Sequence, residues 1–316
     1  MRLIKQSFEI WNQPAGLEGV YKQIERIGRV CYKSEDKITE DSAKPFVDRM
    51  VKYGHGAMLE HGTVYLEFHV KDPSEVGEEE YHSQQSELNK LINRYANNKY
   101  SIIKVNHYYD TVFITTNYRV LIENNWLKDL KYICEPTVFH EKRVTVHFIC
   151  DRGISHEFVR HRVMSFAQES TRYCNYSKDK FGNELTFIIP CWMDIPEGSI
   201  NLGNYDKTSA RYEDGNIHII DTKPPYVGVD FIRSLCEAEA DYLSIVRNGW
   251  KAEEARNVLP LSLKTELYMC AFAEDWKKFF ELRSKKYGVG NPHPQADELA
   301  TPLYEEFVKR GYINER

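Results

Sequence analysis

The chain has 316 residues, of which 42% are hydrophobic and 28% charged, so it can bury the core of one large or two ordinary globular domains. Its net charge of -5 provides no global positive field for capturing nucleic acid or an anionic membrane. Any anion must therefore be bound by a local cluster of side chains.

The amino terminus lacks the apolar run of a secretory signal, and no stretch approaches the roughly 18 consecutive apolar residues of a membrane span. We therefore expect a soluble, cytoplasmic protein without a nucleic-acid or membrane partner. The seven cysteines are scattered and contain no C-x-x-C pair, which indicates reduced, mostly buried thiols and no metal site.

The first elements along the chain are two helices. Residues 17–32 carry apolar side chains at helical spacing, and a second helix is predicted within residues 41–58. This second helix begins at Asp41 or Ser42 and ends at Gly54.

Two strands with similar patterns follow, at residues 62–70 and 142–150. Their alternation is typical of half-buried strands, and the similarity suggests that they pair in one antiparallel sheet. Residues 71–141 between them form an ordered insertion, with a helix at 86–98 and a strand running into a helix at 111–125.

The second half is mainly helical. A turn-rich, polar insertion at 196–225 is typical of a surface loop, and residues 228–249 then predict a helix. Residues 251–288 predict a short helix, a break at Pro260 and two more helical pieces, and residues 295–311 predict a last amphipathic helix.

The segment 157–173, EFVRHRVMSFAQESTRY, concentrates basic, hydroxyl and amide side chains. Ser155 is a suitable N-cap for a helix over HEFVRHRVM, on which Arg160 and Arg162 project in different directions. The two guanidiniums could bind different parts of a large anionic ligand, since each planar guanidinium can donate two hydrogen bonds to one phosphate.

Two other interpretations of this segment are open. An isolated Arg-His-Arg tripeptide is most often a solvated helix face, paired here to Glu157 and Glu169. The arginines could also form a nucleic-acid-binding stripe with the aromatic residues Phe158, Phe166 and Tyr173, although the negative net charge of the chain disfavours this interpretation.

RHRVMSFAQES, from Arg160 to Ser170, resembles the signature of the flavin-dependent thymidylate synthases, which make dTMP without a cysteine nucleophile. Three further segments resemble motifs of this family in the same order: GHGAMLEHGTVYLEFHV at 54–70, QESTRY, and ARNVLPLSL followed by FFELR. The resemblance covers roughly residues 16–70, 143–195 and 228–312 and leaves the insertions unexplained.

The resemblance implies one domain over residues 1–316 with an α/β (α+β) fold, a central mostly antiparallel sheet flanked by helices, and insertions near 71–141 and 196–225. It implies a homotetramer whose active sites form where subunits meet. The implied reaction is the reductive methylation of dUMP, with 5,10-methylenetetrahydrofolate as carbon donor and FAD, reduced by NADPH, as hydride carrier. A flavin- or nucleotide-binding protein without catalysis is the alternative.

The resemblance also assigns residues to the FAD and to the nucleotide. Those expected at the FAD are His55, Ala57 (through its backbone), Arg160, His161, Arg162, Gln168, Phe272 and Lys278, the last two where the family carries amides. Those expected at dUMP are Glu157, Arg160, Gln168, Glu169, Ser170, Thr171, Arg172, Arg256 and Arg283, with Ser170 to Arg172 on the phosphate.

Arg283 is the expected catalytic residue. A fixed cation beside uracil N3 stabilises the negative charge that develops as the ring is activated. Alternatively, Arg283 could simply cap a helix C-terminus near Gly288.

Overall fold

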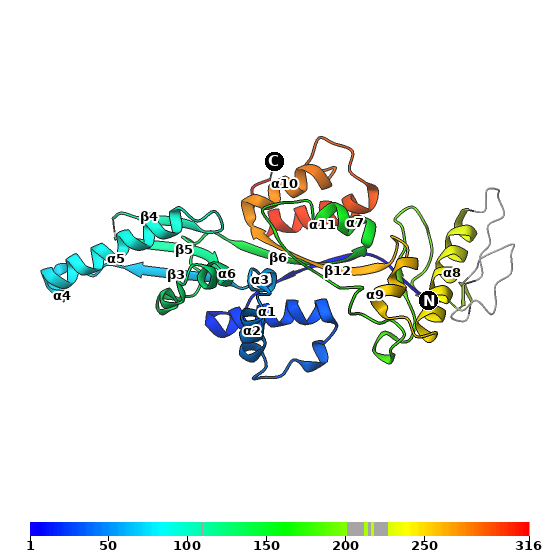
Figure 1. Cartoon of the computed structure of the whole chain (residues 1–316). Coiled ribbons are helices and arrows are strands. Elements are labelled where there is room, and N and C mark those ends of the chain that lie inside the picture. The colour runs from blue at the N-terminus through cyan, green and yellow to red at the C-terminus, as the bar shows by residue number, and fades with distance from the viewer. Residues whose placement is uncertain (109, 201–211, 214–215, 218–226, 316) are drawn as a thin grey trace.

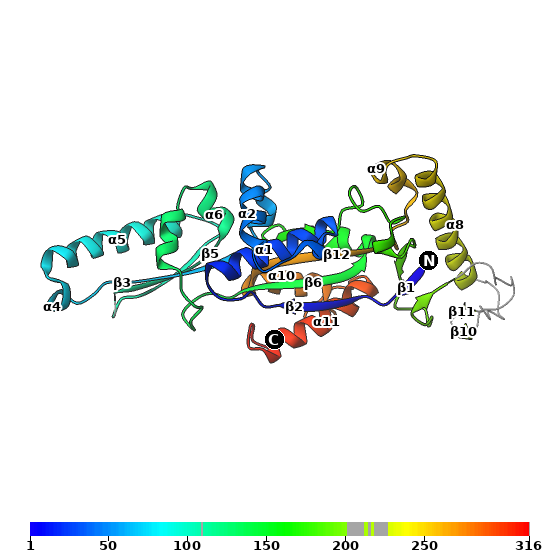
Figure 2. The same ribbon diagram turned by 90° about the horizontal axis from the view of Figure 1, so that it is seen from below.

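The computed structural model describes residues 1–108, 110–200, 212–213, 216–217 and 227–315, so most of the 196–225 insertion lies outside the described residues. A four-stranded sheet with helices on both faces forms the centre, an arm extends from one end, and a smaller sheet with a long helix occupies the other (Figures 1 and 2). Among the described residues, no helix is long and apolar enough to cross a membrane.

Within the described residues the strands form four sheets, three of them entirely antiparallel. Their bounds are β1 Arg2–Ile4, β2 Ser7–Trp11, β3 Thr63–His69, β4 Ile102–Asn106, β5 Thr111–Asn117, β6 Arg143–Asp151, β7 Ser165–Gln168, β8 Thr186–Ile188, β9 Gly198–Ser199, β10 Tyr212–Glu213, β11 Asn216–Ile217 and β12 Lys264–Phe272. The orders are β2-β6-β12-β7, β3-β5-β4, β8-β1-β9 and β10-β11, and β1 and β8 are the parallel pair.

The helices and 3-10 turns connect and cover these sheets. The α-helices are α1 Gly16–Tyr32, α2 Ala43–Lys52, α3 Gly56–Leu59, α4 Pro73–Val76, α5 Glu78–Ala96, α6 Tyr118–Glu123, α7 Arg152–Phe158, α8 Val227–Arg247, α9 Ala252–Ala255, α10 Ala273–Arg283 and α11 Pro294–Lys309. The 3-10 turns are η1 Glu35–Lys37, η2 Leu127–Tyr132, η3 Asp179–Phe181 and η5 Arg256–Val258.

The central sheet separates two hydrophobic layers, because successive side chains of a strand point to opposite faces. Leu267 of β12 packs with Trp276 and Phe279 of α10 on one face. Its neighbour Tyr268 packs with Ile27 of α1 on the other. The expected class, a mostly antiparallel sheet flanked by helices, is confirmed.

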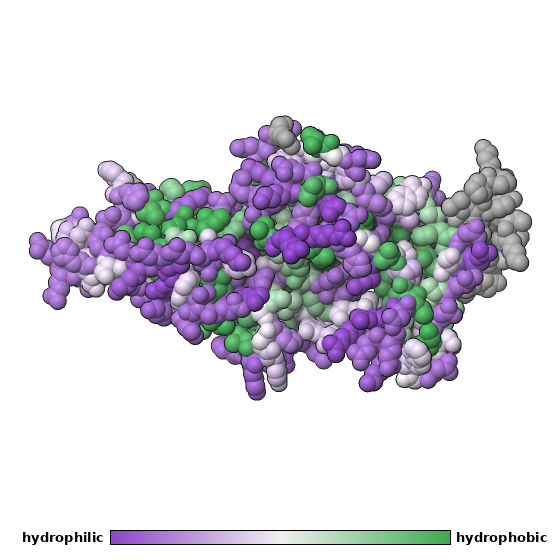
Figure 3. All heavy atoms as spheres, turned by 45° about the horizontal axis from the view of Figure 1, so that its top comes forward, coloured by the Kyte–Doolittle hydropathy of each residue, from purple (hydrophilic) through white to green (hydrophobic). Residues whose placement is uncertain are grey.

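The arm is built from β3, β4, β5 and α5, so most of the 71–141 insertion folds onto the strand that precedes it. Leu88 and Leu91 of α5 are buried with Val64 of β3 and Ile114 of β5. Hydrophilic residues run along much of its surface, with a smaller patch of apolar residues beside them (Figure 3).

The expected pairing of strands 62–70 and 142–150 is wrong, because they belong to different sheets. β3 pairs along its whole length with β5, which the insertion supplies, whereas β6 lies between β2 and β12. Similar alternation indicates that each strand has at least one buried face but carries no information about its partner.

The expected helices within 251–288 are wrong in one part. Residues 264–272 form β12, a central strand antiparallel to β6 with Lys264 opposite Asp151 and Phe272 opposite Arg143. Its last six residues are all buried, and a strand covered on both faces has the same continuous apolar sequence as a buried helix.

The helix expected over 156–164 is shifted. α7 begins at Arg152, and the N-cap is Asp151, whose carboxylate accepts a hydrogen bond from the Ile154 amide at 2.7 Å. Ser155 lies inside the helix and donates to the Arg152 carbonyl at 2.9 Å. Because α7 ends at Phe158, the Arg-His-Arg tripeptide lies in the turn beyond it and not on a helix.

The remaining predicted elements are confirmed with shifts at their ends. They are α1, α2, the β5–α6 unit, α8 and α11, and the helix expected at 86–98 is the second half of α5. Five of the seven cysteines are buried, as expected for structural thiols.

Candidate active site

The short edge strand β7 organises the 157–173 segment. It pairs with β12, so the Arg-His-Arg turn precedes the strand and the Ser-Thr-Arg turn follows it, at its opposite ends. Within β7, Ala167 packs toward α1 and Phe166 toward α10. The sequence motif is therefore split in space by a strand.

The first group of predicted residues that meet is Arg283, Glu157 and His161. Arg283, the last residue of α10, forms an ion pair with the Glu157 carboxylate and donates to the Glu157 carbonyl at 2.9 Å. Its Nε also donates to His161 Nε2 at 3.3 Å. Residues more than one hundred positions apart are thus joined.

His161 is neutral in this arrangement. The imidazole is 9% exposed, and burial, together with the adjacent Arg283 charge, lowers its pKa to about 4. A neutral ring that accepts at Nε2 must carry its proton on Nδ1. His161 therefore orients Arg283 without adding a second positive charge.

Gln168 links the motif to the central sheet. Its side-chain amide donates to Ser155 of α7 at 2.8 Å and to Thr265 of β12 at 3.2 Å. The side chain predicted at the junction of flavin and nucleotide is thereby fixed between β7, α7 and β12.

A second group connects the turn after β7 with the upstream Gly-His motif. The exposed Arg172 pairs with Glu253 at 3.0 Å and lies over the ring of Tyr173. Tyr173 packs on Tyr32 with ring centroids 5.2 Å apart, and the Tyr32 hydroxyl lies 3.4 Å from His55 Nδ1. The structure thus brings His55 near the segment predicted to hold the phosphate.

Other predicted residues stand apart. Ala57 of α3, Arg256 of η5 and Lys278 of α10 are exposed, and no hydrogen bond or ion pair among the described residues joins them to Arg283. Arg160 is exposed as well, but its charge acts on Arg283 and adds to burial in lowering the pKa of that guanidinium. Thr171 is buried, and Ser170 is anchored through its amide to the Cys31 carbonyl at 3.1 Å. Within one chain, the predicted site residues do not converge on a single cavity.

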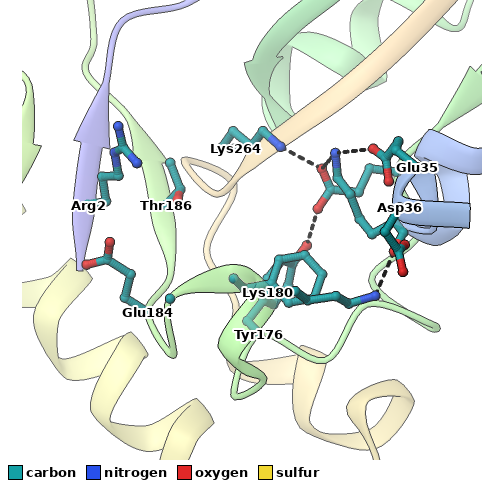
Figure 4. A pocket seen from close by; sticks show the side chains of 12 residues that line it. Arg2, Glu35, Asp36, Tyr176, Lys180, Glu184, Thr186 and Lys264 are labelled. Atoms are coloured by element: carbon teal, nitrogen blue, oxygen red, sulfur yellow. Dashed lines mark hydrogen bonds and ion pairs between the residues drawn. The ribbon is translucent and has the colours of Figure 1, made fainter.

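Glu169 lines a cavity of about 620 Å³, here called the lysine cavity. Its carboxylate is almost fully buried and accepts from Lys264 at 2.8 Å and from the Tyr176 hydroxyl at 2.9 Å. Figure 4 shows Lys264 and Tyr176 extending into this cavity from different elements. Lys33, at the end of α1, lies 3.9 Å from it.

The same network includes Glu266 of β12. Lys264 lies 2.6 Å from its carboxylate, Lys33 is also paired with it, and His147 contacts it at 3.0 Å. Burial acts to raise the pKa of Glu266, but the His147 hydrogen bond and the two lysine charges hold that pKa well below its usual range. Sequence reasoning missed Lys264 and Glu266 because their strand was assigned to a helix.

A second cavity of about 520 Å³, here called the arm cavity, lies where the arm meets the central sheet. Arg162 and Phe272, both predicted at the FAD, line it together with Arg143 of β6 and with Lys99, Tyr100 and Arg119 of the insertion. The buried Phe272 ring has the Arg143 guanidinium 5.7 Å from its centroid. Among the described residues, no group of histidine, cysteine and acidic side chains could hold a metal ion.

A family model described as "Thymidylate synthase complementing protein" matches residues 123–310, more than half of the chain. The chain belongs to this family. The matched region contains the 157–173 segment, Arg256 and Arg283, so the resemblance carried by those motifs is confirmed. The Gly-His segment at 54–70 lies outside it.

Several curated members of the family are similar to parts of the chain. The flavin-dependent thymidylate synthase of Pyrococcus furiosus is 26% identical over 164 residues, which is 52% of this chain and 53% of that protein. The enzyme of that name from Geobacter sulfurreducens is 29% identical over 133 residues, 42% of this chain and 43% of its own. The chain thus spans about half the length of these relatives or less.

One solved structure is the UMP/dUMP methylase PolB of Streptomyces cacaoi bound with 5-Br dUMP. Its sequence is 15% identical to that of the present chain, and the TM-score is 0.42. The match covers 98% of the present chain and 93% of the PolB chain.

Proposed function

We propose that this chain is a flavin-dependent thymidylate synthase that methylates dUMP to dTMP. In this proposal 5,10-methylenetetrahydrofolate donates the carbon, and NADPH supplies the reducing equivalents. FAD, when bound, carries the hydride that completes the methyl group. Family membership and the names of the curated relatives support the reaction class.

The observation that carries the proposal is the contact of Arg283 with both Glu157 and His161. Two motif segments more than one hundred residues apart in the chain meet there, and contacts with Glu157 and His161 hold the guanidinium. A preorganised cation costs little reorganisation when charge develops on a substrate. We assign Arg283 to the uracil ring and Glu157 and His161 to its orientation.

The rest of the segment binds and orients in this proposal. Ser170, Thr171 and Arg172 hold the dUMP phosphate, with Arg172 exchanging its exposed partner Glu253 for the phosphate oxygens. Gln168, Glu169 and Arg256 complete the nucleotide site, and Arg160, His161 and Arg162 face the flavin. His55, Ala57, Phe272 and Lys278 remain predictions for the FAD.

The residues of the chain fit an anionic flavin. Arg143 and Arg162 line one cavity with aromatic neighbours, and no carboxylate of the described residues forms an ion pair with either. The predicted site residues of one chain do not line a single cavity, which supports a site completed by other subunits, so we propose a homotetramer. We also propose that the protein is cytoplasmic.

The decisive experiment combines colour with product formation. Purified protein should be yellow, should bleach when NADPH is added without oxygen, and should convert dUMP to dTMP only when the folate donor is present. Colourless protein that forms no dTMP contradicts the proposal. Yellow protein that binds dUMP without turnover supports the non-catalytic alternative.

Arg283→Ala tests the catalytic assignment. We expect turnover to fall on the order of 100-fold, because a fixed cation at the developing charge is lost. Arg310→Ala is the matched control, since Arg310 follows α11 and is paired with Glu306 at 2.6 Å. If Arg283→Ala binds FAD and dUMP and makes dTMP at the parental rate, Arg283 is not catalytic.

A further inference from the structure

The arm cavity joins the insertion to the 157–173 segment. One wall comes from the arm, with Lys99 and Tyr100 between α5 and β4 and Arg119 on α6. The other wall comes from the central sheet, with Arg143 at the start of β6 and Arg162 before β7. The insertion therefore reaches a residue predicted to contact the FAD.

Arg143 is a buried cation with neutral partners. It is 9% exposed, and its guanidinium donates to the Glu60 carbonyl at 3.1 Å, to Thr63 Oγ1 at 3.4 Å and to Ser165 Oγ at 3.4 Å. No carboxylate of the described residues lies within ion-pair distance. Since burying a charge without a counterion is costly, the site favours a negatively charged occupant.

Most of the carboxylates that line the arm cavity already form ion pairs with a single residue. Arg119 pairs with Glu123 at 2.7 Å and with Glu60. Asp275 is the other acidic residue in the lining; burial acts to raise its pKa, whereas the charges of Lys278 and Arg143 act to lower it. Arg143, Arg162 and Lys99 thus outnumber the carboxylates available to them.

The shape and the aromatic side chains add a second constraint. Lys99 lies 4.8 Å from the centroid of the Tyr100 ring, so a cation and an exposed ring occupy the arm side of the cavity together. A volume of 520 Å³ is within the usual range of roughly 300–1,000 Å³ for small-molecule sites. Such a site suits an anion attached to an aromatic ring.

We propose that the arm cavity binds the diphosphate of a dinucleotide, with Arg143 and Arg162 on its phosphates and Lys99 and Tyr100 as a wall supplied by the insertion. The inference rests on the proposed function, which brings two dinucleotides, FAD and NADPH, to the protein. The insertion is then part of a ligand site and not only packing.

The experiment reverses one charge in the arm. Lys99→Glu is compared with Lys90→Glu, which makes the same change on an exposed position of α5 outside the cavity lining. We measure the Kd of FAD by titrating protein stripped of flavin, and the NADPH concentration that half-saturates bleaching of the flavin-loaded protein. Lys99→Glu should raise one of these values about tenfold, whereas Lys90→Glu should leave both unchanged.

The two readouts distinguish the source of the diphosphate. A change in the FAD Kd assigns the cavity to the flavin, and a change only in half-saturation by NADPH assigns it to the nicotinamide dinucleotide. Tyr100→Ala should weaken the same ligand and Tyr100→Phe should retain it. If Lys99→Glu matches Lys90→Glu in both readouts, the inference is wrong.

Failure of the proposed function looks different. Unaltered protein that binds both dinucleotides but never makes dTMP contradicts the synthase and leaves the arm site standing. Unaltered protein that binds neither dinucleotide contradicts both.

Discussion

The two cavities contain similar numbers of basic side chains but neutralise them differently. In the lysine cavity, Lys264 lies 2.8 Å from Glu169 and 2.6 Å from Glu266, and Lys33 is paired with Glu266 as well. In the arm cavity, the hydrogen bonds that Arg143 makes to the described residues go to carbonyl and hydroxyl oxygens, and Arg162 is exposed. Lys33 and Lys264 are thus paired with carboxylates of the chain, whereas no carboxylate of the described residues forms an ion pair with Arg143 or Arg162.

This difference separates a structural network from a binding surface. Buried ions that are already paired give up part of their stabilisation if a ligand takes one partner away. Cations without carboxylate partners can bind an anion without breaking an ion pair. We therefore expect substitutions in the lysine cavity to change stability and substitutions in the arm cavity to change ligand affinity.

Lys264→Ala is the substitution with the largest expected effect on stability. Removing one member of a buried ion-pair network leaves charges uncompensated, which costs roughly 3–5 kcal/mol of unfolding free energy. We expect about 3 kcal/mol, the lower end of that range, because Lys33 and His147 still contact Glu266 and Tyr176 still contacts Glu169.

Chemical denaturation measures this change. Arg2→Ala is the control, since Arg2 is an exposed cation that lines the same cavity. Equal stability of the two variants would show that the lysine network is not structural, and the contrast between the cavities would fail.

The pH dependence of stability should distinguish the contribution of His161 from that of Glu266. Because burial and Arg283 lower the pKa of His161 from 6.5 to about 4, its protonation favours the unfolded chain. Its stabilisation is complete above pH 6.5 and is lost as the pH falls from there to 4. Glu266, whose pKa is depressed, contributes stability that is lost only below its unfolded value of 4.5.

We expect His161 to account for about 2 kcal/mol of the stability lost between pH 7 and pH 4.5. Denaturant titrations at several pH values measure it, and His161→Gln should flatten the curve in that range. The slope should not vanish, because burial also lowers the pKa of His61, to about 3. His156→Gln, an exposed position on α7, is the control and should keep the parental slope. A parental slope in His161→Gln would mean that His161 is not held neutral.

The motifs predicted the family better than they predicted local structure. The Arg-His-Arg and Ser-Thr-Arg turns could be identified by residue type and spacing, and family membership followed. The helix boundary around them could not, because Asp151 and Ser155 are both good N-caps and the choice depends on where β6 ends.

The errors in the fold have a common cause. β12 is buried on both faces, and β3 has its partner in the insertion, so both depend on contacts between distant segments. Local periodicity reports how a residue is buried and not which strand lies beside it. The lysine network was missed for the same reason, since Lys33 and Lys264 are far apart in the chain.

The smallest effect on stability is expected for Arg162→Ala, the counterpart of Lys264→Ala in the arm cavity. Because the guanidinium is exposed, its loss should change the free energy of unfolding by less than about 0.5 kcal/mol. The same variant should bind FAD more weakly in a titration of stripped protein. Arg162→Lys should fall between it and the parent, since a lysine keeps the charge but not the planar fork. A stability loss comparable to that of Lys264→Ala, with FAD binding unchanged, would mean that Arg162 also belongs to a structural network, and the two cavities would no longer differ in kind.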